Sequence, residues 1–259
     1  MKTKLSIVKI GGNVIENKTE LAAFLLNFSK LEGKKILVHG GGKLATKLAS
    51  KLGIESQMVN GRRVTDSNSL EIITMVYGGL TNKNIVANLQ ANGTNAIGLS
   101  GADGNTIQAH KRPVKEVDFG FVGDIEGVNA SLIDALLQAH LTPVFCALSH
   151  DGNGQILNTN ADTIASEIAI GMSALYDTTL YYSFEKKGVL RNIEDEDSIV
   201  KHINTKKYKA LLEEGIIADG MLPKLENCFH ALQNKVGKVC LGNIEMIQPE
   251  ATLFTTITL

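Results

Sequence analysis

The chain has 259 residues, 44% of them hydrophobic, and this length allows one large α/β domain or two smaller ones with their own cores. Its 26 Lys and Arg nearly balance 27 Asp and Glu, and the net charge of −1 argues against binding to nucleic acid or to an anionic membrane. The sequence shows no secretion signal and no long apolar span, so we expect a cytoplasmic protein without a membrane anchor.

Three cysteines, Cys146, Cys228 and Cys240, occur at spacings unlike those of metal sites. An odd number without any C-x-x-C pair predicts neither a disulfide framework nor a zinc site. We expect all three to be reduced and mostly buried.

Apolar runs alternate with amphipathic patterns along the first half of the chain. The runs predict strands over residues 5–10, 35–39, 96–100 and 143–148. Apolar residues spaced three or four apart predict helices over residues 21–28 and 132–137. This alternation is typical of a mainly parallel sheet with helices on both faces.

The remaining elements follow in the same order as the chain. Residues 106–109 and 154–157 predict short hairpin strands over one end of the sheet, where they can form a lid. A helix is expected over residues 161–171, and strands over residues 178–183, 238–241 and 252–259. We place a domain boundary near Asp177, so that residues 1–177 form one lobe and residues 178–259 form the other.

Glycine-bearing turns follow three of the predicted strands, at residues 9–12, 39–42 and 100–104. In an open α/β sheet, ligands bind beyond the carboxyl ends of the strands, where glycines let backbone N–H groups approach anionic oxygens. The sterics of a tight turn explain each glycine equally well on its own. Their recurrence indicates a phosphate site.

Two known phosphate signatures can be compared with these turns. Neither Gly42-Lys43 nor Gly237-Lys238 is followed by Ser or Thr, so the chain has no Walker-type P-loop. The dinucleotide pattern G-x-G-x-x-A does match Gly40, Gly42 and Ala45. A nicotinamide- or flavin-dependent oxidoreductase is therefore an alternative, although no acidic ribose partner follows at the expected place.

Polar residues gather in three further segments. Asn158, Asn160 and Asp162 open a predicted helix, where they can act as caps or bind a ligand. Arg63 lies in a Gly-containing loop at residues 60–66 and can grip a carboxylate with two hydrogen bonds. Lys224 follows a proline that can start a helix.

Taken together and in order, residues 9–12, 39–42, 60–65, 158–162 and 215–224 resemble the acetylglutamate kinases of the amino-acid kinase superfamily. The resemblance spans nearly the whole chain, and the Asn-Gly-x-Arg-Val-Thr loop separates it from carbamate, aspartate and uridylate kinases. It implies an open three-layer αβα sandwich with a mainly parallel central sheet. It also implies a lobe for the acylated amino acid and for dimerisation, a lobe for the nucleotide, and a place in arginine biosynthesis.

The resemblance also implies roles for individual residues. Lys9 and Lys224 would flank the transferred phosphoryl group, and Asp162 would orient both. The substrate would bind at Gly41, Gly42, Arg63, Asn158 and Asn160. The nucleotide would bind at Gly11, Gly12, Glu185, Gly188, Asp219, Gly220 and Met221.

The implied chemistry needs few parts. The acceptor is a carboxylate with a pKa of about 4.3, so it is already ionised at neutral pH and needs no general base. Catalysis then consists of positioning and electrostatic stabilisation, for which lysines and glycine amides are suited. Mg²⁺ would bridge the phosphates of ATP and keep several waters, so we expect no carboxylate cage for a metal in the protein.

The chain departs from the family pattern at two positions. Glu185 stands where an Asp is expected, and Ala102 stands where relatives often have lysine. The short segment before the first strand leaves no room for the helix that links arginine-inhibited relatives into hexamers, so we expect a homodimer insensitive to arginine. The acyl group of the substrate can be acetyl or a longer, charged group such as succinyl. A non-catalytic amino-acid sensor on the same fold is a further alternative.

Overall fold

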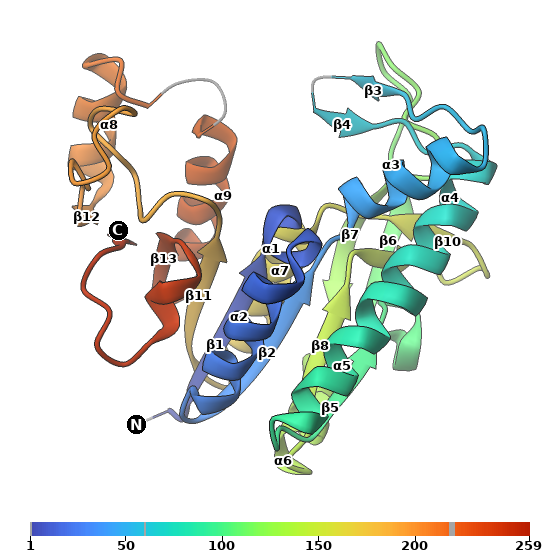
Figure 1. Cartoon of the computed structure of the whole chain (residues 1–259), viewed down its shortest axis with the longest axis horizontal. Helices are drawn as coiled ribbons and strands as arrows, with labels where there is room; N and C mark the ends of the chain where they lie inside the picture. The colour runs from blue at the N-terminus through green and yellow to red at the C-terminus, as the bar shows by residue number, and fades with distance from the viewer. Residues whose placement is uncertain (1, 60, 218–220) are drawn as a thin grey trace.

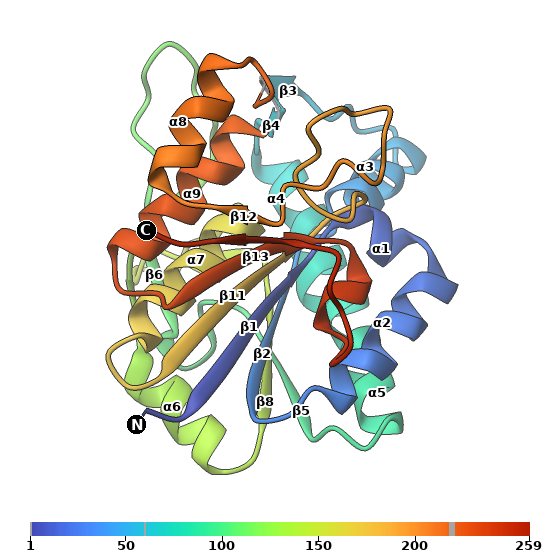
Figure 2. The same ribbon diagram turned by 90° about the vertical axis from the view of Figure 1, so that its left-hand side faces the viewer.

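The computed structural model describes residues 2–59, 61–217 and 221–259. An eight-stranded sheet forms its central layer, with the strand order β12-β14-β13-β11-β1-β2-β8-β5 (Figure 2). All neighbouring pairs are parallel except β13 with β14. In that order, the strands are His202–Ile203, Thr255–Ile257, Lys238–Gly242, Asp177–Ser183, Lys4–Ile10, Lys34–His39, Thr142–Cys146 and Ala96–Leu99.

Helices cover both faces of this sheet (Figures 1 and 2). Alternate residues of β1 point to opposite faces, because successive side chains of a strand alternate. Leu5 and Ile7 pack into one core with α6 (Ala130–Gln138), α7 (Ala161–Met172) and α9 (Leu222–Gln233). Val8 and Ile10 pack into a second core with α2 (Lys18–Lys30) and α5 (Asn82–Ala91). The predicted three-layer αβα fold is confirmed.

Side-chain caps fix where several helices begin. Asn17, Asp66, Asn129, Asn160 and Asn204 each accept a hydrogen bond from a backbone N–H of the first turn. Such caps satisfy donors that the helix itself leaves unpaired. They open α2, α4 (Ser67–Thr74), α6, α7 and α8 (Thr205–Glu213).

A second, four-stranded sheet lies over one end of the first, with the order β10-β9-β6-β7. Its strands are Ile156–Asn158, Leu148–His150, Ile107–Lys111 and Gly123–Val128. The expected short strands exist, and β9 and β10 form an antiparallel hairpin across residues 151–155. β6 pairs antiparallel with β7 and parallel with β9. A separate pair, β3 (Met58–Val59) and β4 (Arg62–Arg63), is antiparallel.

Two predicted strands are wrong in extent. The expected strand over residues 143–148 is split at Ala147, because β8 belongs to the large sheet and β9 to the small one. The Ala147 carbonyl accepts instead from the N–H of Thr159, beyond β10. The strand expected over residues 252–259 is confined to β14, the stretch that pairs with β13.

Helical backbone continues from α4 through the π-helix η1 (Met75–Thr81) into α5. The remaining helical elements are α1 (Gly12–Glu16), α3 (Gly42–Lys51), η2 (Asp103–Asn105) and η3 (Ile244–Ile247).

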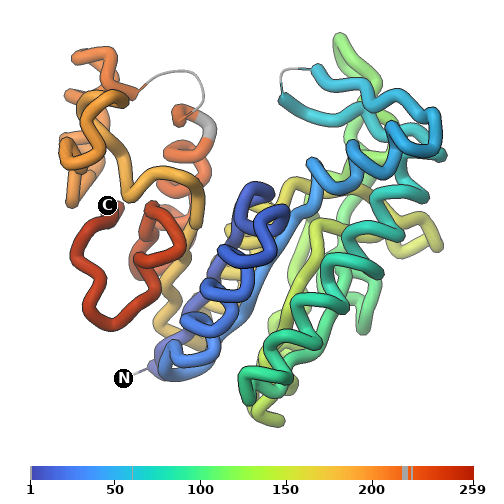
Figure 3. Tube along the Cα trace, viewed as in Figure 1, coloured from blue at the N-terminus to red at the C-terminus, as the bar shows by residue number. Residues whose placement is uncertain are grey.

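The two proposed lobes share one sheet. Asp177, the proposed boundary, begins β11, and β11 pairs with β1 from Asp177 to Tyr182. In Figure 3 the C-terminal residues, orange to red, lie on one side of the N-terminal strand and the cyan and green segments lie on the other.

All three cysteines are buried. Among the residues that the structure describes, no helix is both long and apolar enough to cross a membrane.

Candidate active site

One carboxylate joins two lysines from distant parts of the chain. Lys9 lies near the end of β1, Asp162 in the first turn of α7, and Lys224 in the first turn of α9. Lys9 Nζ is 2.8 Å from Asp162 Oδ1, and Lys224 Nζ is 3.2 Å from Asp162 Oδ2. The structure therefore brings together the three residues that the sequence singled out as catalytic.

The charges of this cluster do not cancel. Burial raises the pKa of Asp162, but the nearby ammonium groups of Lys9 and Lys224 outweigh it and lower the pKa to about 2. The carboxylate is ionised at neutral pH and faces two cations, which leaves one positive charge in excess. A partly buried site with that excess attracts an anion.

Asp162 is held by its neighbours as well as by the lysines. Asn160, the N-cap of α7, accepts a hydrogen bond from the Asp162 N–H at 2.7 Å. The hydroxyl of Tyr182, buried at the end of β11, donates to the Asp162 carbonyl at 3.0 Å. Tyr182 was not singled out from the sequence, because only the paired register of β1 and β11 brings it under α7.

Two of the predicted glycine turns open helices beside this cluster. Gly11 is the N-cap of α1 and Gly41 the N-cap of α3, so unpaired backbone N–H groups are available at both places. Gly41 has φ +156°, and a Cβ there would lie 2.9 Å from a ring carbon of Tyr77. At Gly12, by contrast, a Cβ would meet no atom within 4 Å. Packing thus explains Gly41, whereas Gly12 borders open space.

Arg63 lies against the second glycine turn. Its Nη2 donates to the Gly42 carbonyl at 3.1 Å and to Thr46 Oγ1 at 2.7 Å. The side-chain amide of Asn158 donates to Thr65 Oγ1 at 3.0 Å. Because Arg63 and Thr65 are two positions apart, the predicted substrate residues Gly42, Arg63 and Asn158 belong to one contiguous group.

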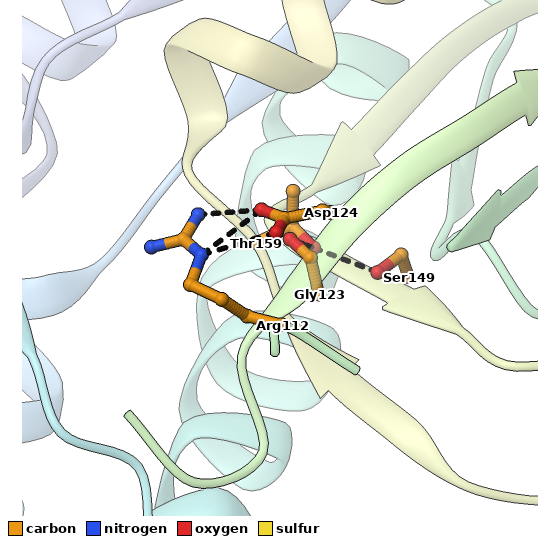
Figure 4. A network of polar contacts seen from close by, with 5 residues as sticks. All are labelled: Arg112, Gly123, Asp124, Ser149 and Thr159. Atoms are coloured by element: carbon orange, nitrogen blue, oxygen red, sulfur yellow. Dashed lines mark hydrogen bonds and ion pairs between the residues drawn. The ribbon is translucent and has the colours of Figure 1, made fainter. Parts of the chain in front are cut away.

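A buried polar network anchors Thr159, which lies between Asn158 and Asn160 (Figure 4). Ser149 Oγ lies 2.7 Å from Thr159 Oγ1, which also contacts the Gly123 carbonyl at 3.4 Å. In the same view, Nε and Nη2 of Arg112 both donate to Asp124 Oδ1, at 3.0 and 2.6 Å. Anchoring Thr159 fixes where its neighbours on either side can point.

His39 contacts the backbone of the second glycine turn, although its sequence pattern was given no role. It is fully buried, its Nδ1 donates to the Gly40 carbonyl at 2.8 Å, and its Nε2 accepts from the amide of Asn82 at 3.0 Å. Burial lowers its pKa to about 4, so the imidazole is neutral. A polar residue at an inward strand position directly before three glycines was the signal that could have revealed it.

The predicted nucleotide residues lie on several elements of the chain. Glu185 accepts a hydrogen bond from the Asn13 amide, next to the first glycine turn. Gly188 is packed: a Cβ there would lie 2.7 Å from Thr255 Oγ1. Met221 is the N-cap of α9. Asp219 and Gly220 lie outside the described residues.

Lys43 was also overlooked in the sequence. Its ammonium donates to the same Asn13 side chain that contacts Glu185. A polar chain thus links the start of α3, the start of α1 and the loop after β11. A lysine in the first turn of a helix opposes the helix dipole, which is a sign that could have drawn notice to it.

Comparison with known proteins places the chain in a family. The model of the Amino acid kinase family matches residues 4–243. Acetylglutamate kinase of Phocaeicola vulgatus is 56% identical over 241 residues, 93% of this chain and 94% of that protein. Acetylglutamate kinase of Cytophaga hutchinsonii is 50% identical over 259 residues, 98% of each chain. The solved structure of N-acetylglutamate synthase from Neisseria gonorrhoeae has the same fold, with a TM-score of 0.80 at 20% identity over 100% of this chain and 59% of that one.

Proposed function

The chain belongs to the amino acid kinase family, and on that premise we propose that it transfers the terminal phosphoryl group of ATP to the side-chain carboxylate of N-acetylglutamate. The product is an acyl phosphate, and the reaction is a step of arginine biosynthesis. The observation that carries this proposal is the binding of Lys9 and Lys224 to one carboxylate, together with relatives of that activity. The oxidoreductase alternative is not favoured, since the same relatives are kinases.

The chemistry follows from the charges of the cluster. The acceptor carboxylate is ionised at neutral pH, so the obstacle is repulsion between two anions and not the removal of a proton. Lys9 and Lys224 would neutralise the oxygens of the phosphoryl group in flight, and Asp162 would hold both ammonium groups at the correct separation. Backbone N–H groups at Gly11, and at the second glycine turn, would add donors that need no reorganisation.

Mg²⁺, when bound with ATP, neutralises phosphate charge. Within the described residues, no group of three His, Cys, Asp or Glu side chains could hold a metal ion. Asp162, a carboxylate of the proposed transfer site, is already shared by two lysines. An ion bound through the oxygens of the nucleotide and through water fits this arrangement, and no protein ligand is assigned to it.

Substrate binding is assigned to both sides of the cluster. Arg63 and Asn158 would hold the α-carboxylate and the acyl amide, with Asn160 beside them and the N–H groups of Gly41 and Gly42 at the attacking carboxylate. The nucleotide would lie over Gly12, toward Glu185 and Met221. The open space around Gly12 and the free end of α1 support this placement.

We also propose a cytoplasmic homodimer. Met75 and Leu80 leave large apolar side chains more than half exposed on the helical unit formed by α4, η1 and α5. Burying such side chains against a second copy is favourable. Size-exclusion chromatography with light scattering should give twice the chain mass, and a monomer at micromolar concentration contradicts this part of the proposal. Turnover measured with and without arginine tests the expected insensitivity to it.

The reaction is tested by measuring ADP release with ATP, Mg²⁺ and N-acetylglutamate, and by trapping the acyl phosphate with hydroxylamine. N-succinylglutamate is assayed in parallel, and comparing the two kcat/KM values shows which acyl group the enzyme prefers. Turnover on either compound supports the kinase. Binding of an acylglutamate without turnover on any of them favours a non-catalytic amino-acid sensor instead.

A further inference from the structure

The π-helix η1 places an aromatic side chain against the glycine turn of the acceptor site. Tyr77 lies within this helix, and its ring is so close to Gly41 that a Cβ there would be 2.9 and 3.1 Å from two ring carbons. The ring extends toward the next residue, since a Cβ on Gly42 would lie 3.6 Å from the Tyr77 hydroxyl oxygen. Single π turns inside α-helices are frequent at functional sites.

The hydroxyl of Tyr77 takes part in none of the side-chain hydrogen bonds found among the described residues, and the residue as a whole is only 6% exposed. Its oxygen is not among the described atoms that are both fully buried and unpaired, so water can reach it, and a ligand at the glycine turn can replace that water as its partner. Burial raises the pKa of Tyr77 despite the opposing charge of Arg63, so the phenol is protonated and is a donor at neutral pH.

A second hydroxyl beside the same turn is also unpaired. Thr81 Oγ1 is buried and finds no hydrogen-bond partner among the described residues. It lies 3.5 Å from the position of a Cβ on Gly41. Two unpaired hydroxyls from one π-helix therefore border the residues Gly41 and Gly42.

Arg63 lies beside the same glycine turn. Its guanidinium lies on the Gly42 carbonyl, and its charge acts on Tyr77. A guanidinium and neighbouring backbone N–H groups form a site for a carboxylate. We propose that Tyr77 is a substrate-specificity residue, whose hydroxyl donates a hydrogen bond to a carboxylate of the acylglutamate beside Arg63 and Gly42. The proposal rests on the proposed function, because that function supplies the dicarboxylate.

The test is Tyr77→Phe, which removes one oxygen and keeps the ring that packs on Gly41. A lost hydrogen bond to a charged group should raise KM for N-acetylglutamate about tenfold or more. KM for ATP should stay within about twofold, because a purely structural defect would disturb both. An acceptor KM within about twofold of the wild-type value overturns the proposal.

Tyr176→Phe is the matched control. Tyr176 is also a buried tyrosine, and its hydroxyl donates to Asp134 at the opposite end of the sheet from Lys9. This variant should lower the melting temperature and leave both KM values unchanged. A wild-type protein that does not phosphorylate acylglutamate at all refutes the proposed function itself, which separates that failure from a failure of the role of Tyr77.

Calorimetric binding distinguishes which carboxylate is contacted. N-acetylisoglutamine carries an amide in place of the α-carboxylate, and N-acetylglutamine carries one in place of the side-chain carboxylate. The affinity difference between wild type and Tyr77→Phe should vanish with the analogue that lacks the contacted carboxylate, as in a double-mutant cycle. A difference that persists unchanged with both analogues contradicts a contact with either carboxylate.

Discussion

Lys9 Nζ and Asp162 Oδ1 lie 2.8 Å apart, although Lys9 is near the end of the first strand and Asp162 opens a helix in the second half of the chain. The pair is possible because Lys9 points to the face of the sheet that α7 covers, as Leu5 and Ile7 do. The side chains of Lys9 and Asp162 are 13% and 15% exposed, so water screens their attraction only in part.

Replacing Lys9 by Met should reduce kcat about a hundredfold or more, because a preorganised charge at the transferred group is lost. Asp162 would keep Lys224 as a partner, so we expect a loss of unfolding free energy of about 1–3 kcal/mol. Steady-state kinetics and urea unfolding measure both effects. Lys47→Met is the control, since Lys47 pairs with Glu16 at 3.1 Å but has a largely exposed side chain. Normal turnover by the Lys9 variant would refute the catalytic assignment.

Asp162→Asn should change the acid stability of the protein. In the folded state, Lys9 and Lys224 hold the pKa of Asp162 at about 2, below its ordinary value of 3.8. The ion pairs therefore stabilise the fold above about pH 4, and about 2 kcal/mol is lost as the pH falls from there toward 2. The variant should lack that loss and should have much lower kcat. Urea unfolding at several pH values measures this, and an unchanged pH dependence would contradict the proposed electrostatic role.

His39 should control stability in a higher pH range. Its folded pKa of about 4 lies below the ordinary 6.5, so protonation favours the unfolded state. The free energy of unfolding should fall as the pH drops from about 6.5 toward 4, by about 3 kcal/mol in total. His39→Gln should flatten this part of the curve. If the variant and the wild type lose stability in parallel across this range, another group is responsible.

Gly41→Ala should damage both the fold and the turnover. The added Cβ would collide with the Tyr77 ring and would occupy a backbone conformation that suits glycine. We expect a loss of about 1–3 kcal/mol and a higher KM for the acceptor. Gly127→Ala is the control, because a Cβ at Gly127 in β7 meets no atom within 4 Å. Equal melting temperatures for the two variants would show that Tyr77 does not press on the turn.

Nucleotide specificity should appear in thermal unfolding. A ligand that binds only the folded state raises the melting temperature, and the rise grows with the logarithm of the ligand concentration above its Kd. ATP with Mg²⁺ should therefore protect the protein, and NAD at the same concentration should not. Protection by NAD alone would revive the oxidoreductase alternative built on Gly40, Gly42 and Ala45.

Much of the architecture could be predicted because it depends on local patterns. Strand and helix periodicities are visible in short windows, and the carboxyl ends of parallel strands meet at one edge of the sheet. That rule alone was enough to expect Lys9 and the glycine turns near each other. The family motifs then brought in Asp162 and Lys224, which the structure joins to Lys9.

The features that escaped the sequence analysis depend on register and on long-range packing. The contact of Tyr182 with Asp162 requires the pairing of β11 with β1, and the contact of His39 with Asn82 crosses from β2 to α5. The break at Ala147 is invisible in sequence because residues on both sides of it are equally buried. Hydrophobicity does not reveal which of two sheets a buried strand joins.

The position of β1 between β2 and β11 bears on how the protein could be divided. A fragment ending at Tyr176 would keep β1 but present its unpaired backbone as an open edge, a template for aggregation. A fragment beginning at Asp177 would carry the complementary strand. Co-expressed, the two pieces should reassemble through β1 and β11, which makes this seam a suitable place for a split reporter.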